Sequence, residues 1–130
     1  MRQYKLQHYV FNTYKSKFIL IDPITINFLY TAFYEIAKTK GFEILACRIL
    51  GDHVHCLIKY DSKHQVHYPV KMLKGISARG FFKKHRTNRY VYRKLWARSY
   101  FSREIGEDQI ETVVEYIENQ IDGSGYDKRF

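Results

Sequence analysis

The sequence predicts an α+β fold of the ferredoxin-like (RRM-like) kind, a single domain in which helices pack on an antiparallel sheet. Its length of 130 residues is enough for one domain with its own core. Segments rich in aromatic and β-branched residues alternate with segments whose apolar residues recur at helical spacing. The resulting order is β(β)αββαβα, and no linker rich in Pro, Gly or Ser divides the chain.

The boundaries of these elements follow from local signals. Asp22 and Pro23 supply an N-cap and a first helical residue, and Gly41 ends that helix. Gly51 and Asp52 form a tight turn between two strands of a hairpin. Strands are expected at residues 7–13 (continued or paired by 18–21), 42–50, 53–60 and 99–105. Helices are expected at residues 23–40, 69–85 and 107–121.

The domain is expected to span residues 1–130, with residues 122–130 as a loosely ordered polar tail. Cys47 and Cys56 lie in hydrophobic runs without a CxxC spacing, which is typical of buried thiols in a reducing compartment. A disulfide would require their strands to be neighbours. The sequence shows no signal peptide and no apolar run near the ~20 residues of a membrane helix. We therefore expect a cytoplasmic protein with no membrane partner.

The chain is strongly basic and rich in aromatic residues. Its 22 Lys and Arg outnumber 13 Asp and Glu, which gives a net charge of +9, and aromatic residues make up 17% of the sequence. Basic charge interleaved with aromatic rings suits a polyanion whose bases can stack on them. A soluble basic protein with no such partner remains the alternative, because charge alone does not separate the two.

The most informative motif is His53-Val54-His55. Side chains alternate along a strand, so the two imidazoles point the same way and Val54 points into a core. Cys56 also points away from them and is not expected to share a site with them. Asp52 is a candidate acceptor for a histidine N–H, which would fix the tautomer of that ring. Two neutral imidazoles side by side supply part of a metal site. Two partly exposed strand histidines that bind no metal would give the same sequence pattern.

The last predicted helix offers a further candidate metal ligand and a candidate reactive side chain. Its helical wheel buries Val113 and Ile117 and leaves Tyr116 and Gln120 as a polar stripe at the edge of the apolar face. Its glutamates, Glu111, Glu115 and Glu118, lie on the solvated side. A tyrosine at this position borders a cleft, although an amphipathic tyrosine at a helix margin would also fit.

His53, His55 and Gln120 together form a neutral ligand set. Such a set leaves the charge of a divalent ion unbalanced and several positions open, so a phosphate oxygen is the natural occupant. This favours Mg²⁺ or Mn²⁺ as the cofactor, because a structural zinc site would be closed and four-coordinate. No other cofactor is indicated.

Tyr116 is the candidate nucleophile. A phenol has an unperturbed pKa near 10, so attack at neutral pH requires an activated electrophile. A metal-bound phosphate provides one, and its attack by Tyr116 would give a phosphotyrosine and a hydroxyl group. Because the linkage conserves the energy of the phosphodiester, the strand can be rejoined without ATP. Tyr126 is a poor second candidate, since nothing nearby in the sequence orients it.

These motifs resemble those of the single-tyrosine transposases of the HUH superfamily, encoded by the insertion-sequence 200/605 group. The resemblance covers nearly the whole chain. It is carried by the first strand (residues 8–13), Asp52-His53-Val54-His55, Leu73-Lys74-Gly75 with Ser77, Leu95-Trp96 with Tyr100-Phe101, and Tyr116-Ile117-Glu118-Asn119-Gln120. The chain departs from the usual family pattern at residues 14–17 and at Arg98-Ser99.

The resemblance implies that His53, His55 and Gln120 are metal ligands and that Tyr116 is the nucleophile. It also implies single-stranded DNA with end hairpins as the substrate and a 5′-phosphotyrosine intermediate. The enzyme would be a metal-dependent transposase, that is, an endonuclease and strand transferase acting at insertion-sequence ends. It would work as a homodimer with shared active sites, the tyrosine helix of each subunit docking on the partner's histidines.

Other readings stay open. A domesticated or non-catalytic hairpin-binding relative would need none of the four site residues, and a structural metal protein would need a fourth ligand. The basic residues predicted to contact DNA phosphates are Lys74, Arg79, Lys83, Lys84, Arg86, Arg89 and Arg93. A solvated basic surface is the alternative for each. His64 and His67 read as solvated, and the aromatic run at Trp96, Tyr100 and Phe101 reads as core more than as a stacking platform.

Overall fold

A four-stranded antiparallel sheet forms the centre of the computed structural model, which describes residues 3–17, 20, 22–84 and 94–120. Its strand order is β2-β3-β1-β4. The strands are β1 (Tyr4–Asn12), β2 (Glu43–Ile49), β3 (His53–Asp61) and β4 (Phe101–Ile105). This order is the one that a βαββαβ chain gives in a ferredoxin-like sheet, so the predicted fold class is confirmed.

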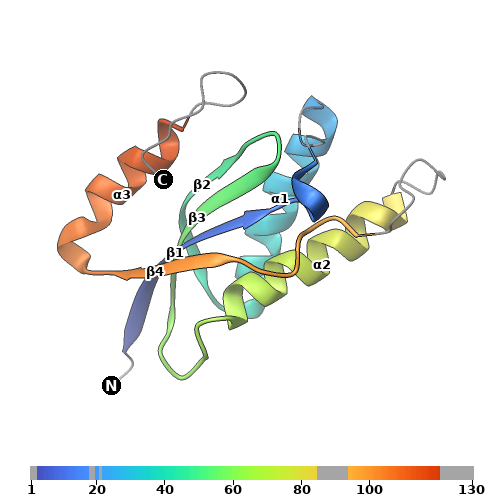
Figure 1. The fold of residues 1–130 in the computed structure, drawn as a ribbon. Coiled ribbons are helices and arrows are strands. Elements are labelled where there is room, and N and C mark those ends of the chain that lie inside the picture. Colours follow the sequence, from blue (N-terminus) through green and yellow to red (C-terminus); the bar gives the residue numbers. More distant parts are fainter. Residues whose placement is uncertain (1–2, 18–19, 21, 85–93, 121–130) are drawn as a thin grey trace.

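The helices divide between the two faces of the sheet (Figure 1). They are α1 (Pro23–Lys40), α2 (Tyr68–Lys84) and α3 (Ile110–Glu118), with short 3-10 turns η1 (Tyr14–Ser16) and η2 (Glu107–Gln109). Helices α1 and α2 cover one face with the larger core, which includes Tyr9, Phe11 and Val54. Helix α3 lies over the other face, where Val113 and Ile117 pack in a smaller cluster with strand residues.

Capping and turn residues set the element boundaries, as the sequence predicts. The Asp22 carboxylate accepts a hydrogen bond from the Thr25 backbone N–H at 3.0 Å, and Gly41 ends α1 with a φ of 80°. The β2–β3 hairpin closes with Leu50 N–H donating to the His53 carbonyl at 2.8 Å. The Asp52 carbonyl accepts from Thr13 N–H at 2.9 Å, which ties the turn to the end of β1.

Strand β4 and helix α3 are shorter than the sequence predicts. Strand β4 begins at Phe101 instead of residue 99, because the Lys74 ammonium donates to the carbonyls of Arg98 and Ser99 at 3.1 and 3.3 Å. Residues 107–109 form a 3-10 turn, and the α-helix ends at Glu118, before Gln120. Within the predicted segment 18–21 only Leu20 is described, and it lies in a turn. Residues 85–93 and 121–130, which include the predicted polar tail, also fall outside the described residues.

The two cysteines lie directly opposite each other on β2 and β3. Cys47 pairs with Cys56 in the ladder, and their Sγ atoms are 3.4 Å apart as two thiols. The strands are therefore neighbours, but the thiols are not joined. Among the described residues, no helix is long and apolar enough to cross a membrane.

Trp96 joins the segment before β4 to the larger core. Its side chain is 7% exposed, its ring packs edge-on against Phe11, and its Nε1–H donates to Ser77 Oγ at 2.9 Å. The core role predicted for Trp96 is confirmed. Ser77 is itself only 1% exposed, and its buried hydroxyl is satisfied because it accepts the hydrogen bond from the Trp96 indole.

We expect Ser77→Ala to lower the free energy of unfolding by about 1–3 kcal/mol, because the buried indole N–H loses its acceptor. Urea unfolding followed by tryptophan fluorescence measures this change. The control is Ser99→Ala, an exposed serine on the same connecting segment, which should stay within about 0.5 kcal/mol of wild type. Equal stability of the two variants would show that the Trp96–Ser77 bond contributes nothing.

Candidate active site

The two motif histidines lie on the α3 face of the sheet. Strand β3 alternates, so Val54 and Cys56 enter the larger core while His53 and His55 share the face of Leu57. Their rings are 5.1 Å apart between centroids, and the residues are 7% and 1% exposed. The orientation predicted for His53, Val54, His55 and Cys56 is therefore confirmed.

These histidines line a cavity of about 710 Å³. Its wall includes Asp52 from the hairpin turn, Gln120 from beyond α3, and Ser99 and Phe101 from the segment that enters β4. Gln120 is 2% exposed, although it lies two residues past the end of its helix. The structure thus brings the predicted ligands His53, His55 and Gln120 together in one cavity.

Helix α3 places Tyr116 beside the histidines. Its ring centroid is 6.1 Å from those of both His8 and His55, and its hydroxyl oxygen is buried. The Gln120 amide Nε2 donates to the Tyr116 carbonyl at 3.0 Å, so Oε1 is the amide atom that can act as a metal ligand. Val113 and Ile117 are buried and the three glutamates of α3 are exposed, as the helical wheel predicts.

Both histidines make a hydrogen bond through Nδ1. His53 Nδ1 is 2.7 Å from Asp52 Oδ1, which confirms the predicted role of Asp52. His55 Nδ1 is 3.2 Å from Nε2 of His8. The Asp52 carboxylate can only accept, so it places the proton of His53 on Nδ1 and leaves Nε2 as the metal-binding nitrogen. His55 presents Nε2 to a metal in the tautomer in which its Nδ1–H donates to His8 Nε2.

His8 is the site residue that sequence reasoning missed. It lies on β1, 4% exposed, on the same face as His55 and within ring contact of Tyr116. The only signal in the sequence was its place in the first-strand motif, because the register that pairs β1 with β3 is a long-range property. Burial lowers the pKa of His8 to about 4 and that of His55 to about 3, with Arg103 adding to the first shift and His53 to the second. Both rings are therefore neutral at neutral pH.

The residues present fit a weakly held divalent ion. Neutral imidazoles can act as ligands, and two imidazoles with one amide oxygen leave room for phosphate. The part of the chain that the structure describes holds no group of three His, Cys, Asp or Glu side chains arranged for a metal. The amide of Gln120 would therefore have to complete the ligand set of His53 and His55.

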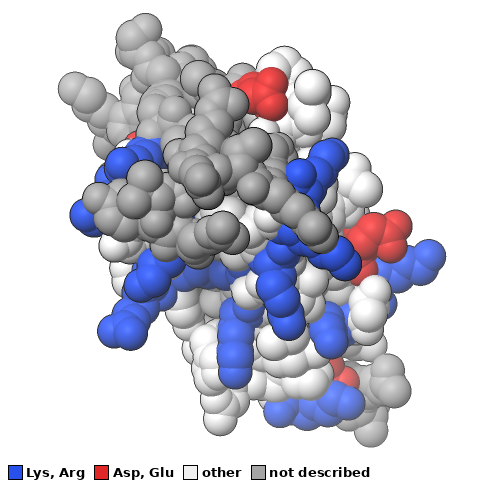
Figure 2. All heavy atoms as spheres, turned by 90° about the vertical axis from the view of Figure 1, so that its right-hand side faces the viewer, with Lys and Arg blue, Asp and Glu red and all other residues white. Residues whose placement is uncertain are grey.

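The residues predicted to contact DNA lie on or after α2. Arg79, Lys83 and Lys84 are exposed, whereas Lys74 is half-buried and holds the segment before β4. Burial lowers the pKa of Lys74. Arg86, Arg89 and Arg93 lie outside the described residues. Figure 2 shows Lys and Arg side chains gathered over the side of the molecule where α1 and α2 lie, with few acidic residues among them.

Comparisons with known proteins agree with this fold. The family described as "Transposase IS200 like" matches residues 3–120. The ISDra2 transposase TnpA of Deinococcus radiodurans is 31% identical over 90 residues, which is 68% of this chain and 64% of that relative. The chain thus aligns with less than two thirds of the length of this relative.

Two solved structures are similar to this one. A crystal structure of a candidate transposase from Deinococcus radiodurans R1 has a TM-score of 0.70 at 27% identity, with 95% of this chain and 94% of that chain covered. A REP-associated tyrosine transposase bound to a REP hairpin has a TM-score of 0.63 at 16% identity, with 87% and 64% covered. The fold is thus that of the tyrosine transposases. The chain belongs to the IS200-like transposase family.

His8 gives a direct test of how His55 is oriented. We expect His8→Phe to weaken Mn²⁺ binding about 10- to 100-fold, because it removes the partner of His55 Nδ1. His8→Gln should lose less, since its amide can replace Nε2 of the imidazole. Titration of Mn²⁺ by electron paramagnetic resonance measures both, with His64→Gln as the control away from the sheet face. Unchanged Mn²⁺ affinity in a folded His8→Phe protein would show that His55 needs no such partner.

Proposed function

We propose that this transposase cleaves and rejoins single-stranded DNA at insertion-sequence ends through a phosphotyrosine on Tyr116. The observation that supports this most directly is the arrangement of the histidine cavity, in which Gln120 lies with His53 and His55, while Tyr116 packs against His55 and His8. Mere binding of DNA needs none of these groups. The buried, neutral imidazoles are suited to ligand roles, and the tyrosine that neighbours them is the only one on α3.

The proposed reaction is an in-line exchange of ester bonds. The Tyr116 oxygen attacks the phosphorus, the bond from phosphorus to the 3′-oxygen breaks, and that oxygen leaves as a hydroxyl after taking up a proton. The 5′-phosphate stays on Tyr116 until another 3′-hydroxyl attacks it and restores the phenol. A Mg²⁺ or Mn²⁺ ion held by His53, His55 and Gln120 would stabilise the charge that develops on the phosphate. Asp52 and His8 keep the two imidazoles in ligand orientation.

The DNA is proposed to be a single strand that carries end hairpins. The REP hairpin belongs to the structural neighbour, so for this chain the hairpin is part of the proposal. Its phosphates are assigned to the basic side chains predicted above on and after α2, of which Arg79, Lys83 and Lys84 are exposed. The positive field of this side would also speed the encounter with DNA.

A homodimer with shared active sites completes the proposal. In the single chain described here α3 lies on its own sheet, so Tyr116 meets the histidines of its own chain. The helix follows β4 through Gly106 and a 3-10 turn, and β4 is an edge strand. In the dimer, the same apolar residues of α3 would pack on the partner's sheet and carry Tyr116 and Gln120 together.

We expect Tyr116→Phe to abolish cleavage and the covalent protein–DNA adduct while leaving DNA affinity within about twofold. The substitution deletes the attacking oxygen and keeps the ring that packs on His55. The measurement is a denaturing gel of labelled end DNA incubated with Mg²⁺, and Tyr34→Phe, an exposed tyrosine on α1, is the matched control. A surviving adduct would move the nucleophile to another residue, and no adduct from wild type would favour a hairpin-binding relative without catalysis.

Mixing two inactive proteins tests the shared site. His53→Ala protein and Tyr116→Phe protein, allowed to exchange subunits, should regain cleavage if α3 serves the partner. Each heterodimer would then contain one site with intact histidines and an intact tyrosine helix. If α3 serves its own chain, no heterodimer has an intact site. Inactive heterodimers, verified by mass spectrometry, would assign the site to a single subunit.

A further inference from the structure

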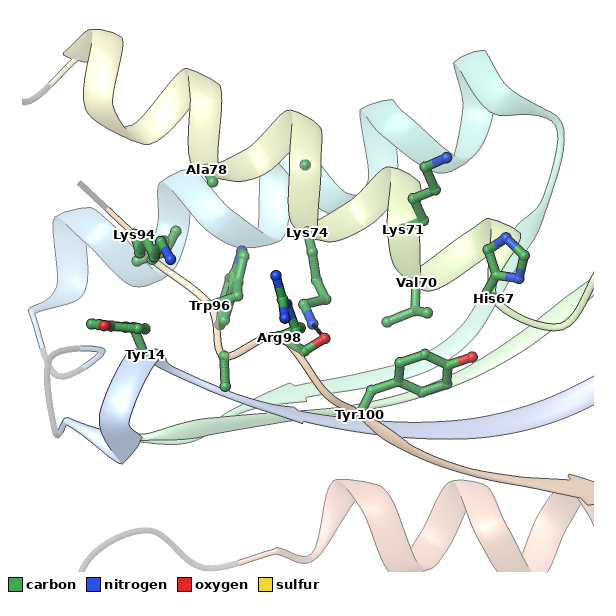
Figure 3. A pocket seen from close by; sticks show the side chains of 13 residues that line it. Tyr14, His67, Val70, Lys71, Lys74, Ala78, Lys94, Trp96, Arg98 and Tyr100 are labelled. Carbon is green, nitrogen blue, oxygen red and sulfur yellow. Dashed lines mark hydrogen bonds between the residues drawn. The ribbon is translucent and has the colours of Figure 1, made fainter. Parts of the chain in front are cut away.

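A second cavity lies on the α2 side of the molecule, between that helix and residues 94–100 (Figure 3). Its volume is about 550 Å³. Among the described residues, its lining has no Asp or Glu and has four cationic side chains, Lys71, Lys74, Lys94 and Arg98. A cavity lined by positive charge favours an anionic ligand.

Aromatic rings stand at the two ends of this cavity. Figure 3 shows Tyr14 at one end and Tyr100 at the other, with Lys74 and Arg98 between them. Both tyrosines are half-buried, so part of each ring faces the cavity. Trp96 lies in the core, and Tyr100 packs against that core while it also lines the cavity. Phe101 is 49% exposed, so the expectation that the aromatic run is core is wrong for Phe101. Rings beside cations are the environment in which proteins bind unpaired nucleotides.

Gly75 keeps the cavity open. It lies in the interior of α2, where glycine costs about 1 kcal/mol relative to alanine. A Cβ built at Gly75 would meet nothing within 4 Å, so no contact inside the described protein requires the glycine. At Gly80, by contrast, a Cβ would lie 3.3 Å from the Phe28 ring. The absent side chain at Gly75 leaves helix backbone exposed to whatever occupies the cavity.

The cavity adjoins the one that holds the histidines. Ala97 and Tyr100 line both, and η1 gives Tyr14 to this cavity and Ser16 to the other. A strand bound across residues 97–100 can therefore occupy both at once.

We propose that this cavity binds one unpaired nucleotide of the strand whose phosphodiester enters the histidine cavity. The base lies against Tyr100 and the Gly75 backbone, and Lys71, Lys94 and Arg98 hold the flanking phosphates. The cavity thereby sets which phosphodiester meets Tyr116. This subsite rests on the proposed function, because it assigns a nucleotide next to the cleaved bond.

The test fills the cavity without disturbing the fold. Gly75→Leu places a side chain in open space, and it should raise the melting temperature because leucine favours the helix more than glycine does. Binding is measured by fluorescence anisotropy with dT20 and with an abasic strand of equal length, in the Tyr116→Phe background. The protein with Gly75 should bind dT20 roughly tenfold or more tightly than the abasic strand. The Gly75→Leu protein should lose most of that preference.

A charge variant gives an independent measurement. Lys94→Gln with Arg98→Gln should weaken both strands, whereas Lys38→Gln, an exposed lysine on α1, should weaken neither. Loss of the base preference without loss of stability supports the proposal. An unchanged preference in a folded Gly75→Leu protein, or equal affinity of the parent for both strands, would overturn it. The covalent adduct on Tyr116 is measured separately, in protein that keeps this tyrosine. A negative result for the base preference therefore does not contradict the cleavage proposal, and the absence of cleavage does not affect the binding measurement.

Discussion

The alternation of strand β3 is the constraint on which the rest of the molecule depends. Val54 and Cys56 are fully buried among residues of the α1 and α2 layer, and this fixes the register of the strand. A slip of one residue would drive His53 and His55 into that apolar layer and turn Val54 toward α3. The hydrophobic core and the candidate active site are thus two faces of one strand, and neither can shift without the other.

The three helices contribute unequal numbers of buried side chains to the packing on this sheet. Helices α1 and α2 pack on each other and on the sheet, and they share most of the buried side chains. Helix α3 has only two buried residues, Val113 and Ile117, yet it carries the tyrosine and leads to the glutamine. The rigid part of the fold therefore holds the imidazoles, and the least anchored described helix holds the group proposed to react with DNA.

Local signals predicted most of the fold. Asp22, Pro23 and Gly41 defined α1, and the alternation of residues 53–57 placed the histidines on one face. The wheel of α3 placed Tyr116 correctly at the margin of its apolar face. What sequence reasoning missed depends on contacts between distant segments. His8 reaches His55 only through the pairing of β1 with β3, and β4 starts late because an α2 lysine takes two backbone carbonyls.

The role of Ser77 shows why such contacts are hard to foresee. A serine inside a helix carries no local signal for an indole 19 residues later in the sequence. The same holds for Tyr100, which the sequence places in an aromatic run but which the fold turns toward a cavity. Membership of a run is a property of the sequence, whereas the face on which a ring ends depends on the segments that pack around it.

The burial of the Tyr116 hydroxyl has a consequence for when this protein can act. The oxygen is enclosed between α3 and the sheet, so it is out of reach of solvent in the arrangement described here. Lifting α3 from the sheet would expose Val113 and Ile117, at roughly 1.5–3 kcal/mol for each buried aliphatic side chain, together with the buried Gln120. The attachment of one short helix thus separates the enclosed tyrosine described here from an exposed one.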